Sequence, residues 1–129
     1  MIESAMTFSL AEARQQTQIP LIVTDQEGIV VEINAPFEQV FGWTATEIRG
    51  QHVTVILPVS FRDAHHLGFS RFQATEVATL LNHPLKLKAL TKGGQEIWSE
   101  HYIMAEKQGQ TWCFAALLRP LPHEETVCD

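Results

Sequence analysis

The sequence predicts an α+β fold in which one antiparallel sheet of five strands carries short helices on one face and a separate helix caps the N-terminus. Two segments rich in β-branched residues come first, at residues 21–24 and 29–33, and three further segments of strand character follow residue 84. The helix signals lie between these two groups. Strands at both ends of a domain, with helices between them, favour a single antiparallel sheet.

The first third of the chain predicts a short helix followed by a β-hairpin. Ser9 and Glu12 have the spacing of a capping box, and residues 10–16 are rich in good helix formers. The turn residues at 25–28 (DQEG) separate the two opening strands. We therefore expect these strands to pair through a tight turn.

Several short helices are predicted in the middle of the chain. Asn34 can cap a helix whose first turn holds Pro36, and Gly42 ends that helix. Thr44 and Glu47 form a second capping box. The remaining segments are a brief apolar stretch at residues 54–57 and the longest predicted helix, at residues 61–75.

The last third predicts three strands. Apolar and charged residues alternate over residues 85–89 (LKLKA), which indicates a strand with one solvent-facing side. Turns at 92–95 and 107–110 separate it from strands at 96–106 and 112–118. The segment 119–122 (RPLP) breaks the pattern, so we divide the chain into an N-terminal cap helix (1–17), one domain (18–120) and a loose C-terminal tail (121–129).

Composition and charge exclude several classes of function. The 129 residues suit one domain with its own core, and the formal net charge is −6. Such a surface repels phosphate backbones, so we expect no nucleic-acid binding. No apolar run approaches the roughly 20 residues of a membrane-spanning helix, and the N-terminus lacks the pattern of a signal peptide. Cys113 and Cys128 have no metal-ligand or redox spacing. We therefore expect free thiols in a cytoplasmic protein with no membrane partner.

Six short motifs follow one another in an order that is found in a known family. They are residues 21–30 (LIVTDQEGIV), 34–37 (NAPF), 41–43 (FGW), 47–51 (EIRGQ), 56–58 (ILP) with Arg62 and His65, and 90–96 (LTKGGQE). The first is similar to the opening hairpin of PAS domains, and the next three are similar to their Asn-x-x-Phe, Phe-Gly-Tyr and Glu-Leu-x-Gly-x patterns. Over about residues 18–120 the chain therefore resembles the PAS family.

The resemblance implies a sensory domain and not an enzyme. Such a domain binds a small molecule or a partner in an interior pocket and signals through protein–protein contacts. Many PAS domains end in an Arg-Asp-Ile-Thr-Glu motif that leads into a coiled coil, whereas Arg119 is followed here by Pro120, which blocks a helix. We therefore expect a stand-alone sensor that signals through a homodimer or a partner signalling protein. A ligand-free interaction module is the alternative.

The helix predicted at residues 61–75 presents an aromatic arc. On an ideal helix, at about 100° per residue, His65 lies in the middle of an arc formed by Phe61, Phe69 and Phe72. His66 falls at the edge. We therefore expect His65 to face the interior and His66 to face solvent.

The same helix resembles that of oxygen-sensing haem PAS domains. There the histidine matching His65 binds the iron, and the arginine matching Arg71 contacts a haem propionate. Two positions depart from this pattern. The family's distal arginine aligns near Leu85, and its second propionate-contacting histidine aligns near Thr79. Haem held by His65 is thus one reading, and a hydrogen-bonded core histidine is the other. A small-molecule ligand or no cofactor is the main expectation. Flavin fits less well, because no cysteine falls in the helical region, where light-sensing relatives form their adduct.

The penultimate strand contributes a second inward histidine. Alternation puts Ile97, Ser99, His101 and Ile103 on one face, which the PAS pattern directs inward. His101 would then be a second haem ligand, a hydrogen-bond donor to a small ligand, or a core residue bonded to Ser99 or the backbone. The expected ligand-binding residues are His65, Phe69, Arg71, Phe72, Leu85, Leu87, Ile97, Ser99, His101, Ile103 and Phe114, and His65 is a metal ligand only if haem is bound.

The opposite face of that strand predicts a contact surface. Trp98, Tyr102 and Met104 lie there, and an apolar outer sheet face is a common dimer interface in PAS domains. Packing by the N-terminal helix is the alternative. A catalytic site is not expected, since Cys113 lies on a different element from Asp63 and the adjacent histidines, and the set has no motif spacing. The six histidines also lack zinc-site spacing.

Overall fold

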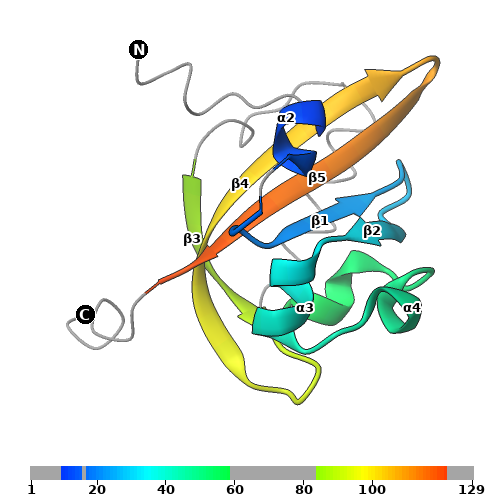
Figure 1. Cartoon of the computed structure of the whole chain (residues 1–129). Coiled ribbons are helices and arrows are strands. Elements are labelled where there is room, and N and C mark those ends of the chain that lie inside the picture. Colours follow the sequence, from blue (N-terminus) through cyan, green and yellow to red (C-terminus); the bar gives the residue numbers. More distant parts are fainter. Residues whose placement is uncertain (1–9, 16, 59–83, 122–129) are drawn as a thin grey trace, which may run out of the picture.

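The computed structural model describes residues 10–15, 17–58 and 84–121, and these residues contain a five-stranded antiparallel sheet (Figure 1). The strands are β1 (Leu21–Thr24), β2 (Val30–Ile33), β3 (Pro84–Leu90), β4 (Glu96–Gln108) and β5 (Thr111–Pro120), and their spatial order is β2-β1-β5-β4-β3. The helices are α2 (Leu10–Arg14), α3 (Ala35–Phe41), α4 (Ala45–Ile48) and the 3₁₀ helix η1 (Val53–Ile56). The predicted α+β class with a five-stranded sheet is confirmed.

The opening hairpin forms around Asp25. Its carboxylate accepts hydrogen bonds from the backbone N–H groups of Glu27 and Ile29, at 2.9 and 3.0 Å, and Gly28 supplies the positive φ of 86° that ends the turn. β2 begins one residue later than predicted, because Ile29 forms an isolated bridge with His52. The predicted turn is confirmed.

Local capping sets the helices that follow the hairpin. The side chain of Asn34 accepts a hydrogen bond from the Phe37 N–H at 3.1 Å, and Gly42 ends α3 with a φ of 82°. In α4, Thr44 and Glu47 exchange both bonds of a capping box. These three signals were all predicted from the sequence. The long helix predicted at residues 61–75 lies outside the described residues.

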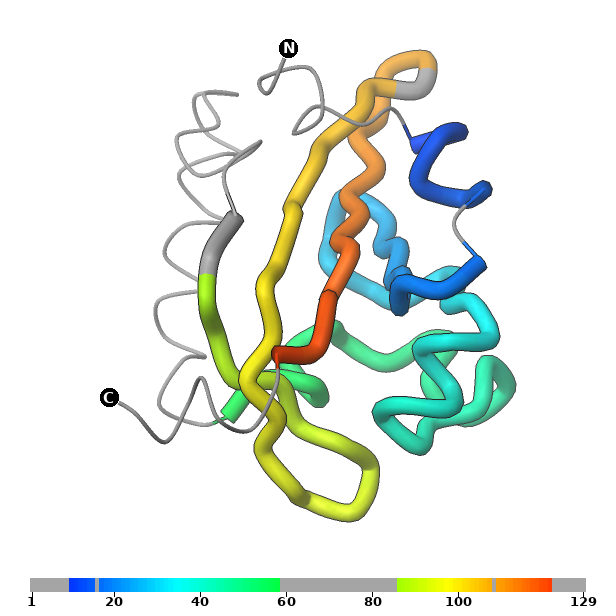
Figure 2. Tube along the Cα trace, turned by 60° about the vertical axis from the view of Figure 1, so that its left-hand side comes forward, coloured from blue at the N-terminus to red at the C-terminus, as the bar shows by residue number. Residues whose placement is uncertain are grey.

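The last hairpin is longer than predicted. β4 and β5 pair continuously from Ser99 opposite Pro120 to Gln108 opposite Thr111, and Figure 2 shows the two strands side by side up to their turn. β4 therefore continues past residue 106, and β5 reaches Pro120 instead of ending at 118. Proline is tolerated there because it is the last strand residue, and the Leu121 N–H donates to the Trp98 carbonyl at 2.9 Å.

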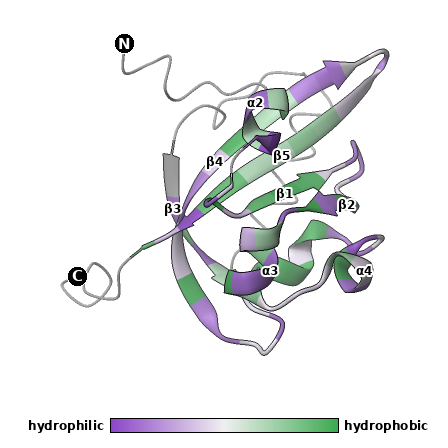
Figure 3. Cartoon of the chain, viewed as in Figure 1, coloured by the Kyte–Doolittle hydropathy of each residue, from purple (hydrophilic) through white to green (hydrophobic). Residues whose placement is uncertain are grey.

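Two hydrophobic clusters pack on opposite faces of the sheet. The cluster on the inner face joins the sheet to α3, α4 and η1, and its buried members are Ile22, Val30, Phe37, Phe41, Ile48, Ile56, Leu57, Ala89 and Leu118. The cluster on the outer face lies under α2 and comprises Leu10, Ala13, Leu21, Val23, Met104, Ala115 and Leu117. Figure 1 shows α2 lying over β4 and β5, and Figure 3 shows the hydrophobic character of β1 beside them. The helices after the hairpin thus cover one face of the sheet, as predicted, and the cap helix covers the other, which the sequence had left open.

Candidate functional site

The inner face of β4 carries two buried polar side chains. Ser99 is fully buried and His101 is 4 % exposed. The register places His101 opposite Leu118 of β5, which belongs to the inner cluster, and Ser99 opposite Leu87 of β3. Ile97 packs against the same cluster. The predicted alternation of β4 is therefore correct, and His101 faces the interior from the sheet.

His101 lacks a partner for one ring nitrogen. Its Nε2 is buried and has no hydrogen-bond partner among the described residues. The Ser99 hydroxyl donates to the Ile97 carbonyl at 3.4 Å, a long bond, and not to the imidazole. Burial lowers the pKa of His101 to about 4, so the ring is neutral at neutral pH. An unpartnered neutral imidazole can donate or accept a hydrogen bond, according to its tautomer.

The other predicted ligand-binding residues divide into two groups. Leu87, Ile97, Ile103 and Phe114 are half-buried on the strands beside Ser99 and His101. The backbone of Leu85 pairs with His101. The predicted residues of the middle helix, which are His65, Phe69, Arg71 and Phe72, lie outside the described residues, as do His66 and Asp63.

On the outer face, the cap helix covers part of the predicted dimer interface. Met104 is buried in the cluster under α2, and Tyr102 packs against that cluster. The Glu106 carboxylate on β4 accepts a hydrogen bond from the Leu10 N–H at 2.9 Å, which fixes the start of α2. Trp98 lies beyond the helix, half-buried, with the Lys88 ammonium 5.3 Å from its ring centroid. At Met104 and Tyr102 the outer face is therefore packed by the N-terminal helix, which was the alternative to a dimer contact.

Charged groups surround Trp98 on this outer face. Glu100 accepts hydrogen bonds from the Tyr102 hydroxyl at 3.0 Å and from the Arg119 guanidinium at 2.6 Å. The Arg119 bond lowers the pKa of Glu100 below its usual range. The outer face beyond α2 thus carries the aromatic ring of Trp98, together with Lys88 and the Arg119–Glu100 ion pair.

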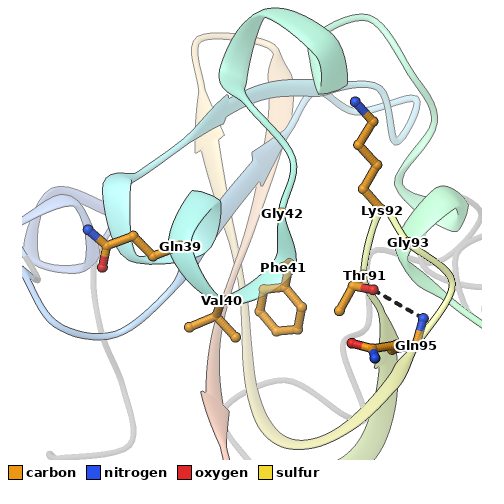
Figure 4. Close-up of a pocket in the computed structure, with 8 residues that line it drawn as sticks. All are labelled: Gln39, Val40, Phe41, Gly42, Thr91, Lys92, Gly93 and Gln95. Carbon is orange, nitrogen blue, oxygen red and sulfur yellow. Dashed lines mark hydrogen bonds between the residues drawn. The ribbon is translucent and has the colours of Figure 1, made fainter.

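A surface hollow between α3 and the β3–β4 turn was not predicted. It has a volume of about 510 Å³ and is lined by Gln39, Val40, Phe41, Gly42, Thr91, Lys92, Gly93 and Gln95. Figure 4 shows Phe41, at the end of α3, beside the turn, in which the Gln95 N–H donates to the Thr91 hydroxyl at 3.1 Å. Lys92 pairs with Glu47 of α4. No functional role was predicted for this turn from the sequence, because the hollow forms only where α3 packs beside the turn.

Two further polar groups bear on function. The indole Nε1 of Trp43 is buried and has no hydrogen-bond partner in the described part of the chain. In the sequence, Trp43 belongs to the Phe-Gly-Trp motif, which indicated the family resemblance but no functional role for this residue. Burial raises the pKa of the Cys113 thiol, which makes it a poor nucleophile.

Among the described residues, no group of three or more potential ligands could hold a metal ion. None of the described helices is long and apolar enough to cross a membrane.

Comparison with known proteins agrees with this architecture. A family model described as the PAS fold matches residues 10–94. An uncharacterized protein of Azorhizobium caulinodans is 29% identical over 102 residues, which cover 78% of this chain and 14% of that protein. The sensor protein FixL of Bradyrhizobium diazoefficiens is 34% identical over 55 residues, which cover 43% of this chain and 11% of FixL. The chain thus spans about a seventh or less of these relatives.

Solved structures support the same fold. A PAS domain from Colwellia psychrerythraea superposes with a TM-score of 0.69 at 16% identity, covering 86% of this chain and 92% of that one. A light-oxygen-voltage domain gives a TM-score of 0.70 at 16% identity, covering 96% and 93%. At these identities the likeness shows the fold alone. Together with the family model, which matches well over half of the residues, it establishes that the chain belongs to the PAS family.

Proposed function

We propose that this PAS domain is a sensory module that binds a small molecule against the inner face of its sheet and signals by protein–protein contacts. The observation that carries the proposal is the imidazole of His101, which is buried opposite Leu118 of the inner cluster and whose Nε2 has no hydrogen-bond partner among the described residues. Leaving a buried polar group unpaired costs about 1–3 kcal/mol. A bound molecule that supplies the missing hydrogen bond would offset that cost.

The kinship with a sensor protein supports the sensory half of the proposal. FixL shares 34% identity with this chain over 55 residues, and the fold is that of sensory domains. The partial burial of Cys113 and its raised thiol pKa speak against nucleophilic catalysis at that residue. We therefore favour a binding module over an enzyme.

The direct test is to find what the purified protein holds. We expect small molecules extracted from freshly purified protein, or hits from a fragment screen, to shift the methyl resonances of Ile97, Ile103 and Leu118 in NMR spectra. These side chains lie on the strands beside His101. Shifts confined to the outer-face methyl of Met104, or no shifts with any compound, would contradict binding at the inner face.

An absorption spectrum of the same sample tests the haem alternative. A Soret band would show haem and replace the small-molecule proposal with the sequence-derived reading in which His65 binds the iron. In that case His65→Ala should abolish the band and His66→Ala should leave it. Visible flavin bands would instead indicate flavin. A featureless spectrum with the NMR shifts above supports the small-molecule proposal.

Signalling contacts are proposed to use the outer face beyond α2. Trp98 is the half-buried member of the predicted interface outside the cluster under α2, which includes Met104 and contacts Tyr102. We expect the wild-type protein to be a dimer in light scattering, and Trp98→Glu to shift it towards monomer, because a charge in a packed interface is costly. Trp112→Glu is the matched control, since Trp112 lies near the far end of the β4–β5 hairpin, with Lys107 5.8 Å from its ring centroid. A wild-type protein that stays monomeric at high micromolar concentration would rule out this dimer.

A further inference from the structure

The helix α2 lies across the outer face of the sheet and is tethered at both of its ends. At its start, the Leu10 N–H donates a hydrogen bond to the Glu106 carboxylate on β4, at 2.9 Å. At its end, the Arg14 guanidinium pairs with the Glu32 carboxylate on β2, at 3.0 Å. In the sheet order β2-β1-β5-β4-β3, these two carboxylates lie on the first and the fourth strand. We call α2 with its two tethers the strap.

An apolar row of the sheet lies between the two tethered strands. The register places Val23 of β1 between Glu32 of β2 and Ala115 of β5. Ala115 in turn pairs with Met104 of β4. The three apolar residues are buried, with exposures of 0 %, 4 % and 6 % along the row, and all belong to the cluster under α2. Release of the strap would therefore uncover this row.

The strap is held by few contacts compared with the sheet beneath it. Its helix has five residues, fewer than an isolated helix needs to be stable, and the side chains that it buries are those of Leu10 and Ala13. The Arg14–Glu32 pair is solvent-accessible, with 45 % and 35 % of the two side chains exposed, so it contributes little stability. By contrast, β4 and β5 are joined by ten consecutive residue pairs. A segment with so few contacts can open locally while the sheet stays paired.

The row under the strap continues into the surface around Trp98. Tyr102 packs against the cluster under α2, and its hydroxyl donates a hydrogen bond to Glu100. Trp98 lies on the same face of β4, two residues before Glu100. Release of the strap would thus join the covered apolar row to the contact surface proposed around Trp98.

We propose that α2 is a releasable strap that limits the outer contact surface of the domain, and that its release lets a second copy of this chain pack on the row of Val23, Ala115 and Met104. The inference rests on the proposed function, because it regulates the outer-face contact proposed there. A second copy fits the uncovered row, because the row is continuous with that contact and a two-fold dimer brings the same surface of both copies together. The added apolar area would tighten the dimer.

Oxidation of Met104 by hydrogen peroxide measures the release of the strap. Met104 is 6 % exposed, so its thioether becomes accessible to the oxidant when the strap opens. At a dilution at which the protein is monomeric, we expect Glu106→Ala to raise the oxidation rate about tenfold and Arg14→Ala about threefold, read by peptide mass spectrometry. Arg119→Ala is the matched control, because it removes an ion pair with a similarly exposed arginine on the same face, outside the cluster under α2. It should oxidise like wild type.

Low concentrations of urea separate release of the strap from unfolding of the whole domain. Release exposes little surface, so oxidation of Met104 in the wild type should change little with urea below the unfolding transition. A route through global unfolding would accelerate steeply instead. A steep dependence on urea, or unchanged oxidation in both tether variants, would overturn the strap and leave the proposed function standing.

The double variant Arg14→Ala/Glu106→Ala tests the regulatory step. We expect its dimer dissociation constant in light scattering to fall about tenfold or more relative to wild type, because a larger fraction of the chains has released the strap. Addition of Trp98→Glu should reverse the gain. Faster oxidation of Met104 with unchanged or weaker association would overturn regulation by the strap. If no variant dimerises at any concentration tested, the proposed outer-face contact itself fails, and regulation of it fails too.

Discussion

The folded protein is expected to lose about 3 kcal/mol of stability through His101 alone as the pH falls from about 6.5 to about 4. Burial lowers the pKa of this imidazole from 6.5 to about 4 in the folded state. Between those values the unfolded chain binds a proton that the folded chain does not, so stability rises with pH across the window. Each pH unit of the interval contributes about 1.4 kcal/mol.

The measurement compares denaturant unfolding of wild type and His101→Leu between pH 4 and pH 7.5. Carboxylates such as Glu100, whose pKa is lowered by Arg119, also lose stabilising charge on acidification, but both proteins share them. The difference between the two curves therefore isolates His101. We expect the variant to be markedly more stable than wild type near pH 4. Parallel curves would show that His101 is not buried in its neutral form.

Truncation of Phe41 is expected to cost about 3–5 kcal/mol of unfolding free energy. Phe41 is fully buried and its ring centroid lies 4.8 Å from that of Phe37, so Phe41→Ala leaves a cavity and loses an aromatic contact. Domains of this size have total stabilities of about 5–15 kcal/mol. The single change would therefore remove a large part of the stability of the fold.

Urea denaturation of a short series checks this expectation. Phe41→Leu should cost clearly less than Phe41→Ala, because leucine fills most of the space. Val31→Ala is the control at an exposed position, where the residue is 39% exposed, and should change stability by less than about 0.5 kcal/mol. A loss below about 1 kcal/mol for Phe41→Ala would mean that α3 is not packed on the sheet as described.

Local features of the fold could be predicted from the sequence because they depend on residues close together in the chain. Asn34 caps α3 through the N–H of Phe37, and Thr44 and Glu47 bond across three residues, so neither needs a tertiary partner. The turn around Asp25 is equally local. Alternation along β4 likewise determined that Ser99 and His101 share a face, since side chains of a strand point to opposite sides in turn.

The tertiary structure decided which groups meet, and with them the chemistry of the candidate site. The pairing of β4 with β5 on one side and β3 on the other sets the neighbours of His101 across the sheet, and in this packing its Nε2 has no partner among the described residues. The sequence left open whether His101 bonds to Ser99. It also left open whether α2 covers Met104, which depends on a contact between residues more than 90 positions apart. Such contacts follow from strand order and burial of the whole core, which no local pattern encodes.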